Sequence, residues 1–316
     1  MNLSMSAQRA PLSDGRWHFQ HGPIDIVIGA YGEPAAVKQA HEAAWQRFET
    51  VLQELVGELP VLRRAIPQDA ALTWADASLK GSVARRMWNA CATYRAGFIT
   101  PMAAVAGSVA QELIASYARP GVDRAWVNNG GDIALHLMPG QSVRVGVFAD
   151  LAHWQAALDD VCSDSEDAEG LATDAQCQIE FEMPVRGIAT SGWRGRSFSL
   201  GIADSVTVLA KTAAMADAAA TVIANAVNVA HPGIVRRPAC DIRDDSDLGA
   251  MRVTVDVPRL SSDKVRQALA AGQRKADSLA GCGLIESAML VCQGQFAQTT
   301  RPDRVDHNIF QYSLSS

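Results

Sequence analysis

An aspartate and a threonine on one alanine-rich segment are the residues best suited to metal chemistry. Asp217 and Thr221 stand four positions apart, so a helix would carry both on one face. A buried carboxylate without a partner is strongly disfavoured, and a carboxylate with a hydroxyl suits a hard cation such as Mg²⁺. The spacing alone nevertheless favours a solvent-exposed Asp217 that lies beside Lys211 or pairs with an arginine.

A second polar motif follows a strand-like run and contains two adjacent glycines. Its residues are Asn128, Asn129, Gly130, Gly131 and Asp132. Glycines at such positions allow positive φ and leave backbone N–H groups uncovered, which can form an anion-binding nest. A hairpin turn that uses Asn and Gly for left-handed conformations explains the same residues. The motif by itself favours the turn.

A third set of residues combines hydroxyls, backbone donors and guanidinium groups in a short stretch. It consists of Arg186, Thr190, Ser191, Gly192, Arg194 and Arg196. Arginine binds phosphate or carboxylate through two parallel N–H groups, and an exposed basic loop is an equally good interpretation. The chain lacks the dinucleotide-binding, P-loop and zinc-protease motifs. No catalytic residue is assigned.

The elements that would position these residues mix strands and helices. Strand-like runs cover residues 16–22, 23–32, 124–129, 133–137, 144–150, 178–185, 204–210, 251–260 and 284–296. Helix-like runs cover residues 36–59, 83–91, 101–119, 212–229 and 263–280. Pro60 is expected to stop the first helix, and Thr100 to cap the third. Because several strands adjoin one another, we predict an α+β fold of mixed sheets with packed helices.

The composition is that of an ordinary globular chain. Its 316 residues are 48% hydrophobic and 20% charged, which favours one domain over residues 1–296 and a polar, loosely held tail over 297–316. The acidic stretch 150–177 is expected to form a surface excursion. With a net charge of −6 and scattered basic residues, nucleic acid is an unlikely partner. The absence of a long apolar run or signal segment predicts a cytoplasmic protein without membrane contact.

Taken in order, the motifs resemble the ApbE family, the FAD:protein FMN transferases. AVAGSVAQELI, VNNGGDI, ATSG and SVTVLAKTAAMADAAAT are similar to that family's glycine-containing helix start, N-x-GGDI turn, ATSG turn and SVTV strand with its A-D-x-x-x-T helix. An ApbE-like branch of unknown function is more similar still. That resemblance includes FQHGPIDIVIGA, ITPMAAVAG, RGIATSGWRGRSFSLGIADSVTVLA and DSDLG, and it extends over nearly the whole chain.

The resemblance implies an ApbE-like single domain with Asp217 and Thr221 as Mg²⁺ ligands. It also implies a flavin pocket for FAD or FMN, lined by residues 129–132 and 190–192. The expected activity is that of a divalent-cation-dependent enzyme acting on a flavin nucleotide or another anionic small molecule. The alternatives are a non-catalytic flavin- or anion-binding protein, a sulfur-assimilation accessory protein and an interaction subunit. The expected partner is a small anionic ligand, and a homodimer is compatible with the sequence.

Two departures from the family pattern argue against FMN transfer itself. Ala106 stands where the transferases have a lysine before the glycine. Between ATSG and SVTV, the segment SFSLGIAD replaces the family's H-I-I-D-P-x-T-G run. The lost histidine removes a candidate proton acceptor, and Asp204 is the only acid in the shortened segment.

Overall fold

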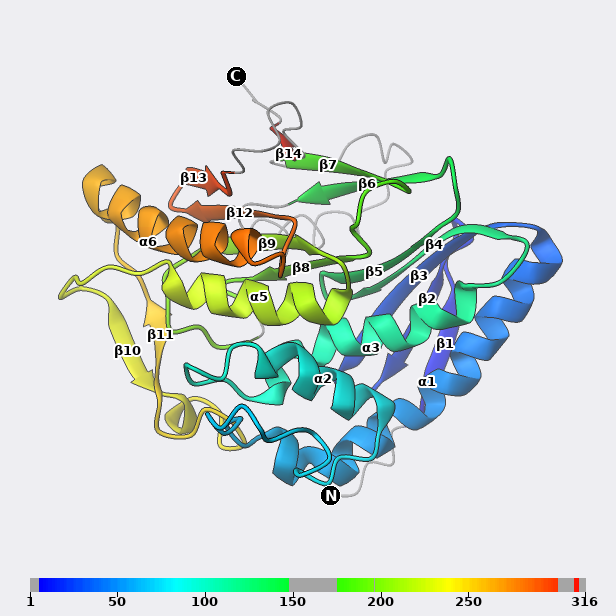
Figure 1. Ribbon diagram of the computed structural model, residues 1–316, viewed down its shortest axis with the longest axis horizontal. Helices are drawn as coiled ribbons and strands as arrows, with labels where there is room; N and C mark the ends of the chain where they lie inside the picture. Colours follow the sequence, from blue (N-terminus) through cyan, green and yellow to red (C-terminus); the bar gives the residue numbers. More distant parts are fainter. Residues whose placement is uncertain (1–5, 148–174, 196, 301–309, 313–316) are drawn as a thin grey trace. The chain divides into compact units, whose positions relative to one another are not determined.

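The computed structural model describes residues 6–147, 175–195, 197–300 and 310–312 (Figure 1). Most of the predicted surface excursion at 150–177, and also Arg196, lie outside these residues. The chain divides into two compact units. The first comprises Met1–Ser142, Glu180–Ala189 and Leu209–Ala218, and the second comprises Val143–Ile179, Thr190–Val208 and Ala219–Ser316. The single domain over residues 1–296 stays a prediction.

The first unit contains an antiparallel sheet of successive neighbours. Its strands are β1 (Gln8–Pro11), β2 (Trp17–His21), β3 (Ile24–Gly32), β4 (Val122–Asn129), β5 (Asp132–Leu137) and the start of β8 (Gly187–Ser191). Ile28 pairs with Val127, and Val127 pairs with Ala134. All three are buried, and because side chains alternate along a strand, they define one apolar face. The pair Asn129–Asp132 continues the same face at the end of the hairpin.

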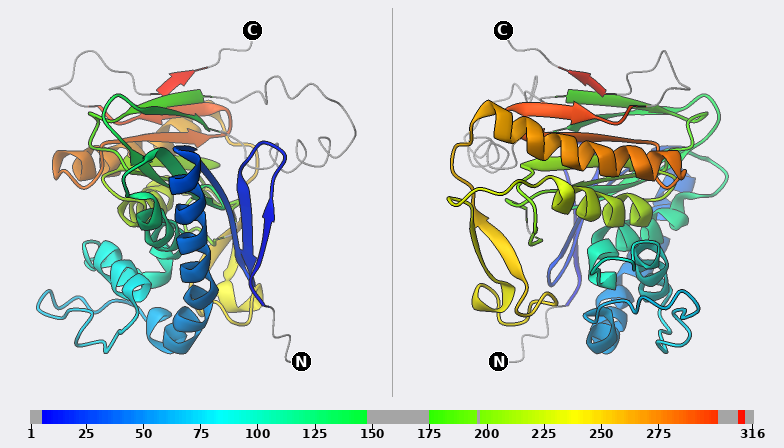
Figure 2. Two further views of the ribbon diagram at one scale, coloured as in Figure 1. Left: turned by 90° about the vertical axis from the view of Figure 1, so that its right-hand side faces the viewer. Right: turned by 60° about the vertical axis from the view of Figure 1, so that its left-hand side comes forward.

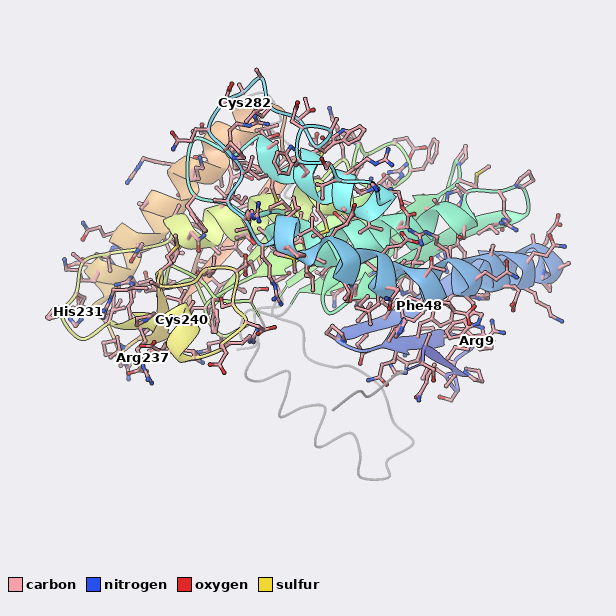
Figure 3. The ribbon with its side chains drawn as sticks, turned by 90° about the horizontal axis from the view of Figure 1, so that it is seen from below. Arg9, Phe48, His231, Arg237, Cys240 and Cys282 are labelled. Carbon is pink, nitrogen blue, oxygen red and sulfur yellow. The ribbon has the colours of Figure 1, made fainter. Side chains whose placement is uncertain are left out.

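Three helices belong to the first unit, namely α1 (Pro34–Leu62), α2 (Ser82–Ala92) and α3 (Val105–Ile114). α1 packs along β2 and β3 (Figure 2), and α3 packs on β4 and β5. Phe48 of α1 lies between this helix and the first strands (Figure 3). Its ring centroid is 5.4 Å from that of Phe19 and 5.9 Å from that of Trp45. Aromatic burial of this kind fixes α1 on the sheet.

Three predictions about the helices of this unit were wrong. α1 continues through Pro60 to Leu62. Pro60 cannot donate the usual backbone hydrogen bond, and the complete burial of Leu62 offsets this loss. The predicted helix over 101–119 is three pieces, since α3 is flanked by the 3₁₀ turns Pro101–Ala104 and Ala115–Tyr117. Ala104, with φ −131° and ψ 21°, separates the first turn from α3, and Thr100 makes no side-chain cap hydrogen bond.

The second unit contains three groups of paired strands. β14 (Phe310–Tyr312), β7 (Ala175–Glu180) and β6 (Ser142–Val147) are neighbours, as are β9 (Ser205–Ala210), β12 (Ser287–Cys292) and β13 (Gln295–Gln298). β10 (Val235–Pro238) pairs with β11 (Arg252–Asp256). In Figure 3, Arg237 marks this hairpin. α6 (Ser262–Gly281) lies along β12 and β13 (Figure 1).

The last part of the chain differs from the sequence prediction. The strand predicted over 284–296 is a hairpin that turns at Gln293 and Gly294. The predicted loose tail contributes β14, in which Phe310 is fully buried and pairs with Cys177 of β7. Burial of this large apolar side chain favours the pairing of β14 with β7. α5 (Ala213–Ala226) confirms the predicted helix after β9 and carries residues of both units.

The described elements confirm the α+β class, with antiparallel strand pairs and five α-helices among them. None of the helices in the described part of the chain is long and apolar enough to cross a membrane.

Candidate functional site

Asp217 of α5 lies at the N-terminus of α3 and caps it. Its Oδ2 accepts a hydrogen bond of 2.9 Å from the N–H of Gly107, and the backbone of Ala106 donates a second bond. α3 begins at Val105, so these N–H groups belong to a first turn that has no partners within the helix. Ala104, at the N-cap position, has no side-chain acceptor, and the carboxylate of Asp217 takes that role from another element.

Small residues make this contact possible. A Cβ atom on Gly107 would stand 2.4 Å from the carbonyl oxygen of Ala213, and one on Gly187 would stand 2.1 Å from the nitrogen of Ala213. Such distances are far inside van der Waals contact. The solvent-exposed position that the spacing favoured for Asp217 is therefore wrong, since its helix packs closely on α3.

The Asn-Gly-Gly-Asp motif forms the hairpin turn between β4 and β5. Gly130 and Gly131 have φ values of +65° and +104°, and Asn129 pairs with Asp132 across the turn. The N–H of Gly131 donates to Oδ1 of Asn128 at 2.8 Å. This donor is therefore already used inside the turn, which confirms the hairpin and leaves one amide fewer for an anion.

The hairpin end and the start of α3 together form a cluster that we call the carboxyl cluster, made of Asn129, Asp132 and Asp217. The side-chain N–H of Asn129 donates to the carbonyl of Ala106 at 3.1 Å, and Asp132 makes a side-chain hydrogen bond to Asp217. Asn129 and Asp132 are buried. Loss of solvation raises the pKa of Asp217 to about 7, although the hydrogen bonds from Gly107, Asp132 and Ala106 act in the opposite direction.

Two hydrogen-bonded carboxyl groups must share a proton, because two carboxylates have no donor between them. The same oxygens fit a hard divalent cation, which can replace the shared proton. Within the described residues, no group of three or more His, Cys, Asp or Glu side chains is placed to hold a metal ion. A cation here would therefore rely on the two carboxyls, on hydroxyl or backbone oxygens and on water. Thr221, one turn further along α5, belongs to the second unit.

Arg186, one of the predicted anion-binding residues, serves the backbone of its own segment. Its guanidinium donates to the carbonyls of Phe181, Met183 and Val185 at 2.7–2.9 Å and lies 5.4 Å from the ring centroid of Phe181. Burial lowers its pKa. Because these donors already satisfy partly buried carbonyls, a structural role explains Arg186 better than charge neutralisation of a ligand.

The other predicted loop residues belong to the second unit. The Thr190 hydroxyl is 2.9 Å from that of Thr207, and Ser191 ends β8. A Cβ atom on Gly192 would stand 2.2 Å from the carbonyl oxygen of Asp204, so this glycine is required by packing. Arg194 is exposed and stacks over Trp193 at 4.9 Å. These residues form a tightly packed turn that carries the exposed residue Arg194.

Asp204, the acid of the shortened segment, is buried and holds two loops together. One of its oxygens accepts the indole N–H of Trp193 at 3.1 Å, and the other accepts the backbone N–H of Gln293. Sequence reasoning did not identify Gln293, whose φ of +46° is rare for a residue other than glycine. Its position before Gly294 in a strand-like run was the one available signal.

The family of the chain follows from a match that extends over most of its length. The family model described as AbpE bacteria matches residues 9–298. The chain belongs to this family. The ApbE-like relationship that the motifs indicated is thereby confirmed.

Relatives of this family member occur among archaeal UPF0280 proteins. The one from Methanopyrus kandleri is 35% identical over 191 residues, which cover 58% of this chain and 67% of the relative. The one from Methanospirillum hungatei is 33% identical over 149 residues, which cover 47% and 53%, and the one from Methanosarcina acetivorans is 29% identical over 231 residues, which cover 72% and 77%. The match thus spans about two thirds of the first relative and about half of the second.

Two solved structures are also similar over nearly their whole length. The ApbE protein of Thermotoga maritima has 12% sequence identity and a TM-score of 0.39, with 94% of this chain and 97% of that chain covered. The apo form of the flavinyl transferase ApbE of Pseudomonas stutzeri has 13% identity and a TM-score of 0.36, with 95% and 96% covered.

Proposed function

We propose that this family member is a divalent-cation-dependent enzyme that acts on a flavin nucleotide or another anionic small molecule. The hydrogen-bonded carboxyls of Asp132 and Asp217 carry the proposal. Bringing two carboxyl groups together out of water is unfavourable unless a proton or a cation lies between them. A carboxylate has about four lone-pair sites, so Asp217 can cap α3 and still offer oxygen to Mg²⁺.

Each residue of the carboxyl cluster has a separate part in this proposal. Asp217 and Asp132 would hold the cation, and Thr221 would add a hydroxyl oxygen from the next turn of α5. Asn129 positions the end of β4 against α3 through its bond to Ala106. When bound, the cation would neutralise and polarise phosphate oxygens of the ligand. The two-glycine turn next to Asp132 leaves space for that ligand, since a Cβ atom on Gly131 would meet nothing within 4 Å.

A non-catalytic flavin- or anion-binding protein is the second candidate, and the segment before β9 favours it. The transferase-type histidine and Thr-Gly pair are absent between Ser197 and Asp204. Instead, Asn225 accepts hydrogen bonds from the Ser199 hydroxyl at 3.1 Å and from the Leu200 N–H at 2.8 Å. This segment is therefore held against α5 and lacks the histidine, and the carboxylate of Asp204 already accepts two hydrogen bonds. FMN transfer to a protein is not part of the proposal.

The cation site is tested by thermal unfolding at pH 8 with and without Mg²⁺. The unfolding temperature of wild type should rise by several degrees at saturating Mg²⁺, because a ligand that binds only the folded state stabilises it. Asp217→Asn keeps an oxygen acceptor for Gly107 but should lose this gain, and Thr221→Val should reduce it. Asp123→Asn, a change at an exposed carboxyl on β4, is the matched control. The same Mg²⁺ response in wild type and Asp217→Asn would refute the site.

Catalysis and binding are then separated by incubation with FAD and Mg²⁺. If chromatography detects FMN or AMP released from FAD, and this release depends on Asp217, the protein is an enzyme. Saturable FAD binding without any product supports the non-catalytic candidate. Wild type that neither binds nor converts FAD, FMN or other nucleotides would contradict both.

A further inference from the structure

The second unit contains a pocket at the start of α6, and it shares no lining residue with the carboxyl cluster. Its volume is about 460 Å³, and it is lined by Arg194, Val257, Arg259, Leu260, Ser262, Val265, Gln293 and Gln295. Two of these residues are arginines, and none of the described lining residues is acidic. The volume lies in the range of small-molecule sites. Five of the lining residues are polar or charged and three are apolar, so the pocket suits a polar, anionic group with a small apolar part.

A buried carboxylate holds the loop that carries Arg194. Asp204 accepts the indole N–H of Trp193 at 3.1 Å and also the backbone N–H of Gln293. The guanidinium of Arg194 in turn lies 4.9 Å from the Trp193 ring centroid, within the range of a cation–π contact. Arg194 therefore follows a residue, Trp193, whose side chain is held in place by Asp204.

The segment that carries Arg259 is fixed by the side chain of Gln293. The amide oxygen of Gln293 accepts the N–H of Leu260 at 2.9 Å, and its amide N–H donates to the carbonyl of Pro258 at 2.7 Å. These two bonds hold the residues on either side of Arg259. Among the described residues, none forms a hydrogen bond or an ion pair with the Arg259 side chain, so that part of the chain uses none of its donors.

Gln293 thus connects both arginine-bearing segments at one point of the β12–β13 turn. Its backbone N–H binds Asp204 on the Arg194 side, and its side chain binds Pro258 and Leu260 on the Arg259 side. The left-handed φ of +46° at this residue is unfavourable for a side chain with a Cβ atom. Strained backbone of this kind persists where surrounding contacts hold it, and it often occurs at binding sites.

Ser262 adds a donor on the α6 side of the pocket. Its hydroxyl oxygen accepts hydrogen bonds from the Gln295 amide at 2.9 Å and from Arg266 at 2.7 Å. With two N–H groups already directed at the oxygen, the hydroxyl proton is the part of Ser262 that can be given to a ligand.

We propose that this pocket binds a small molecule that carries a carboxylate or phosphate group on a short apolar body. Arg194 and Arg259 would pair with the anionic group, and Ser262 would donate a hydrogen bond to it. Val257, Leu260 and Val265 would contact the apolar part. Binding at this pocket requires neither the cation nor the flavin, so it is independent of the proposed function.

The test is calorimetric titration of the full chain in low salt without Mg²⁺. The probes are phenyl phosphate, benzoate and inorganic phosphate. Phenyl phosphate or benzoate should bind saturably and more tightly than inorganic phosphate, because the apolar body is buried as well. Whichever organic probe binds more tightly identifies the anionic group. Arg259→Gln and Arg194→Gln should each weaken binding by about tenfold, since each removes charge-assisted hydrogen bonds.

Two controls keep the result specific. Arg274→Gln removes the same charge from an exposed position later on α6 and should leave binding unchanged. Asp217→Asn should also leave it unchanged, which separates this pocket from the cation site. An equal loss of binding affinity in Arg274→Gln and Arg259→Gln would show a general effect of charge and would overturn the proposal. Wild type without saturable binding of either organic probe up to about 1 mM would also overturn it.

Discussion

The side chain of Asp217 accepts its hydrogen bond from the N–H of Gly107, which lies 110 positions earlier in the chain. This contact joins α5 to the first turn of α3 and places the carboxyl beside Asp132. It gives one residue two compatible roles, as the cap of α3 and as half of a carboxyl pair. Both roles lead to measurable consequences.

Gly107→Ala should destabilise the protein, because the new Cβ atom would stand 2.4 Å from the backbone oxygen of Ala213. Backbone cannot move aside as a flexible side chain can, so a loss of about 1–3 kcal/mol is expected in urea unfolding. Gly57→Ala is the matched control, since it is exposed within α1 and its Cβ atom would meet nothing within 4 Å. That change should stabilise α1 by about 0.5–1 kcal/mol. Similar effects of the two changes would contradict the packing role of Gly107.

The pH dependence of stability should contain a contribution from Asp217 of unusual sign. Burial raises its pKa from the ordinary aspartate value of 3.8 to about 7 in the folded protein, so between these pH values the folded state holds a proton that the unfolded state releases. This stabilisation is complete below pH 3.8 and is lost as the pH rises through 7. The free energy of unfolding, measured without divalent cations, should therefore fall more steeply from pH 5 to 8 in wild type than in Asp217→Asn. Parallel profiles would argue against a proton on this carboxyl pair.

Mg²⁺ should reverse this dependence of stability on pH. At pH 8 the shared proton is lost, and a cation can take its place between Asp132 and Asp217. The apparent affinity for Mg²⁺ should rise as the pH increases from 6 to 8, and binding should release protons, which titrations in buffers of different ionisation enthalpy can detect. A pH-independent affinity without proton release would place the cation elsewhere.

His41 should make the protein sensitive to acid. It is buried in α1, its Nδ1 lies 2.7 Å from the Tyr117 hydroxyl, and burial lowers its pKa from 6.5 to about 4. The unfolded state therefore binds a proton first, and the contribution of His41 is lost as the pH falls from 6.5 to 4. Because this sign is opposite to that of Asp217, stability curves should be compared between wild type and single variants. His41→Phe should flatten the acid limb, whereas His136→Phe, a change on β5 at a half-buried histidine, should not.

Local patterns in the sequence determine much of the first unit. Alternating apolar residues predict β2 and β3, and Asn128–Asp132 predicts the hairpin that joins β4 and β5. The alanine-rich run predicts α5, with Asp217 and Thr221 one turn apart. These features depend on residues within a few positions of one another, where side-chain period and turn chemistry act directly. The order of the motifs along the chain is also sufficient to indicate the family.

Only the tertiary structure decides which of these local pieces meet. Whether Asp217 faces solvent or caps α3 depends on the approach of two backbones at Gly107 and Ala213, and helical spacing is the same in both cases. From the sequence, the guanidinium of Arg186 suits a ligand as well as it suits the backbone carbonyls that it binds in the structure. Gln293 connects two segments through hydrogen bonds with Asp204 and Pro258, which are distant from it in sequence. Such contacts are selected by packing and by the need to satisfy buried polar groups, and neither requirement leaves a periodic trace in the chain.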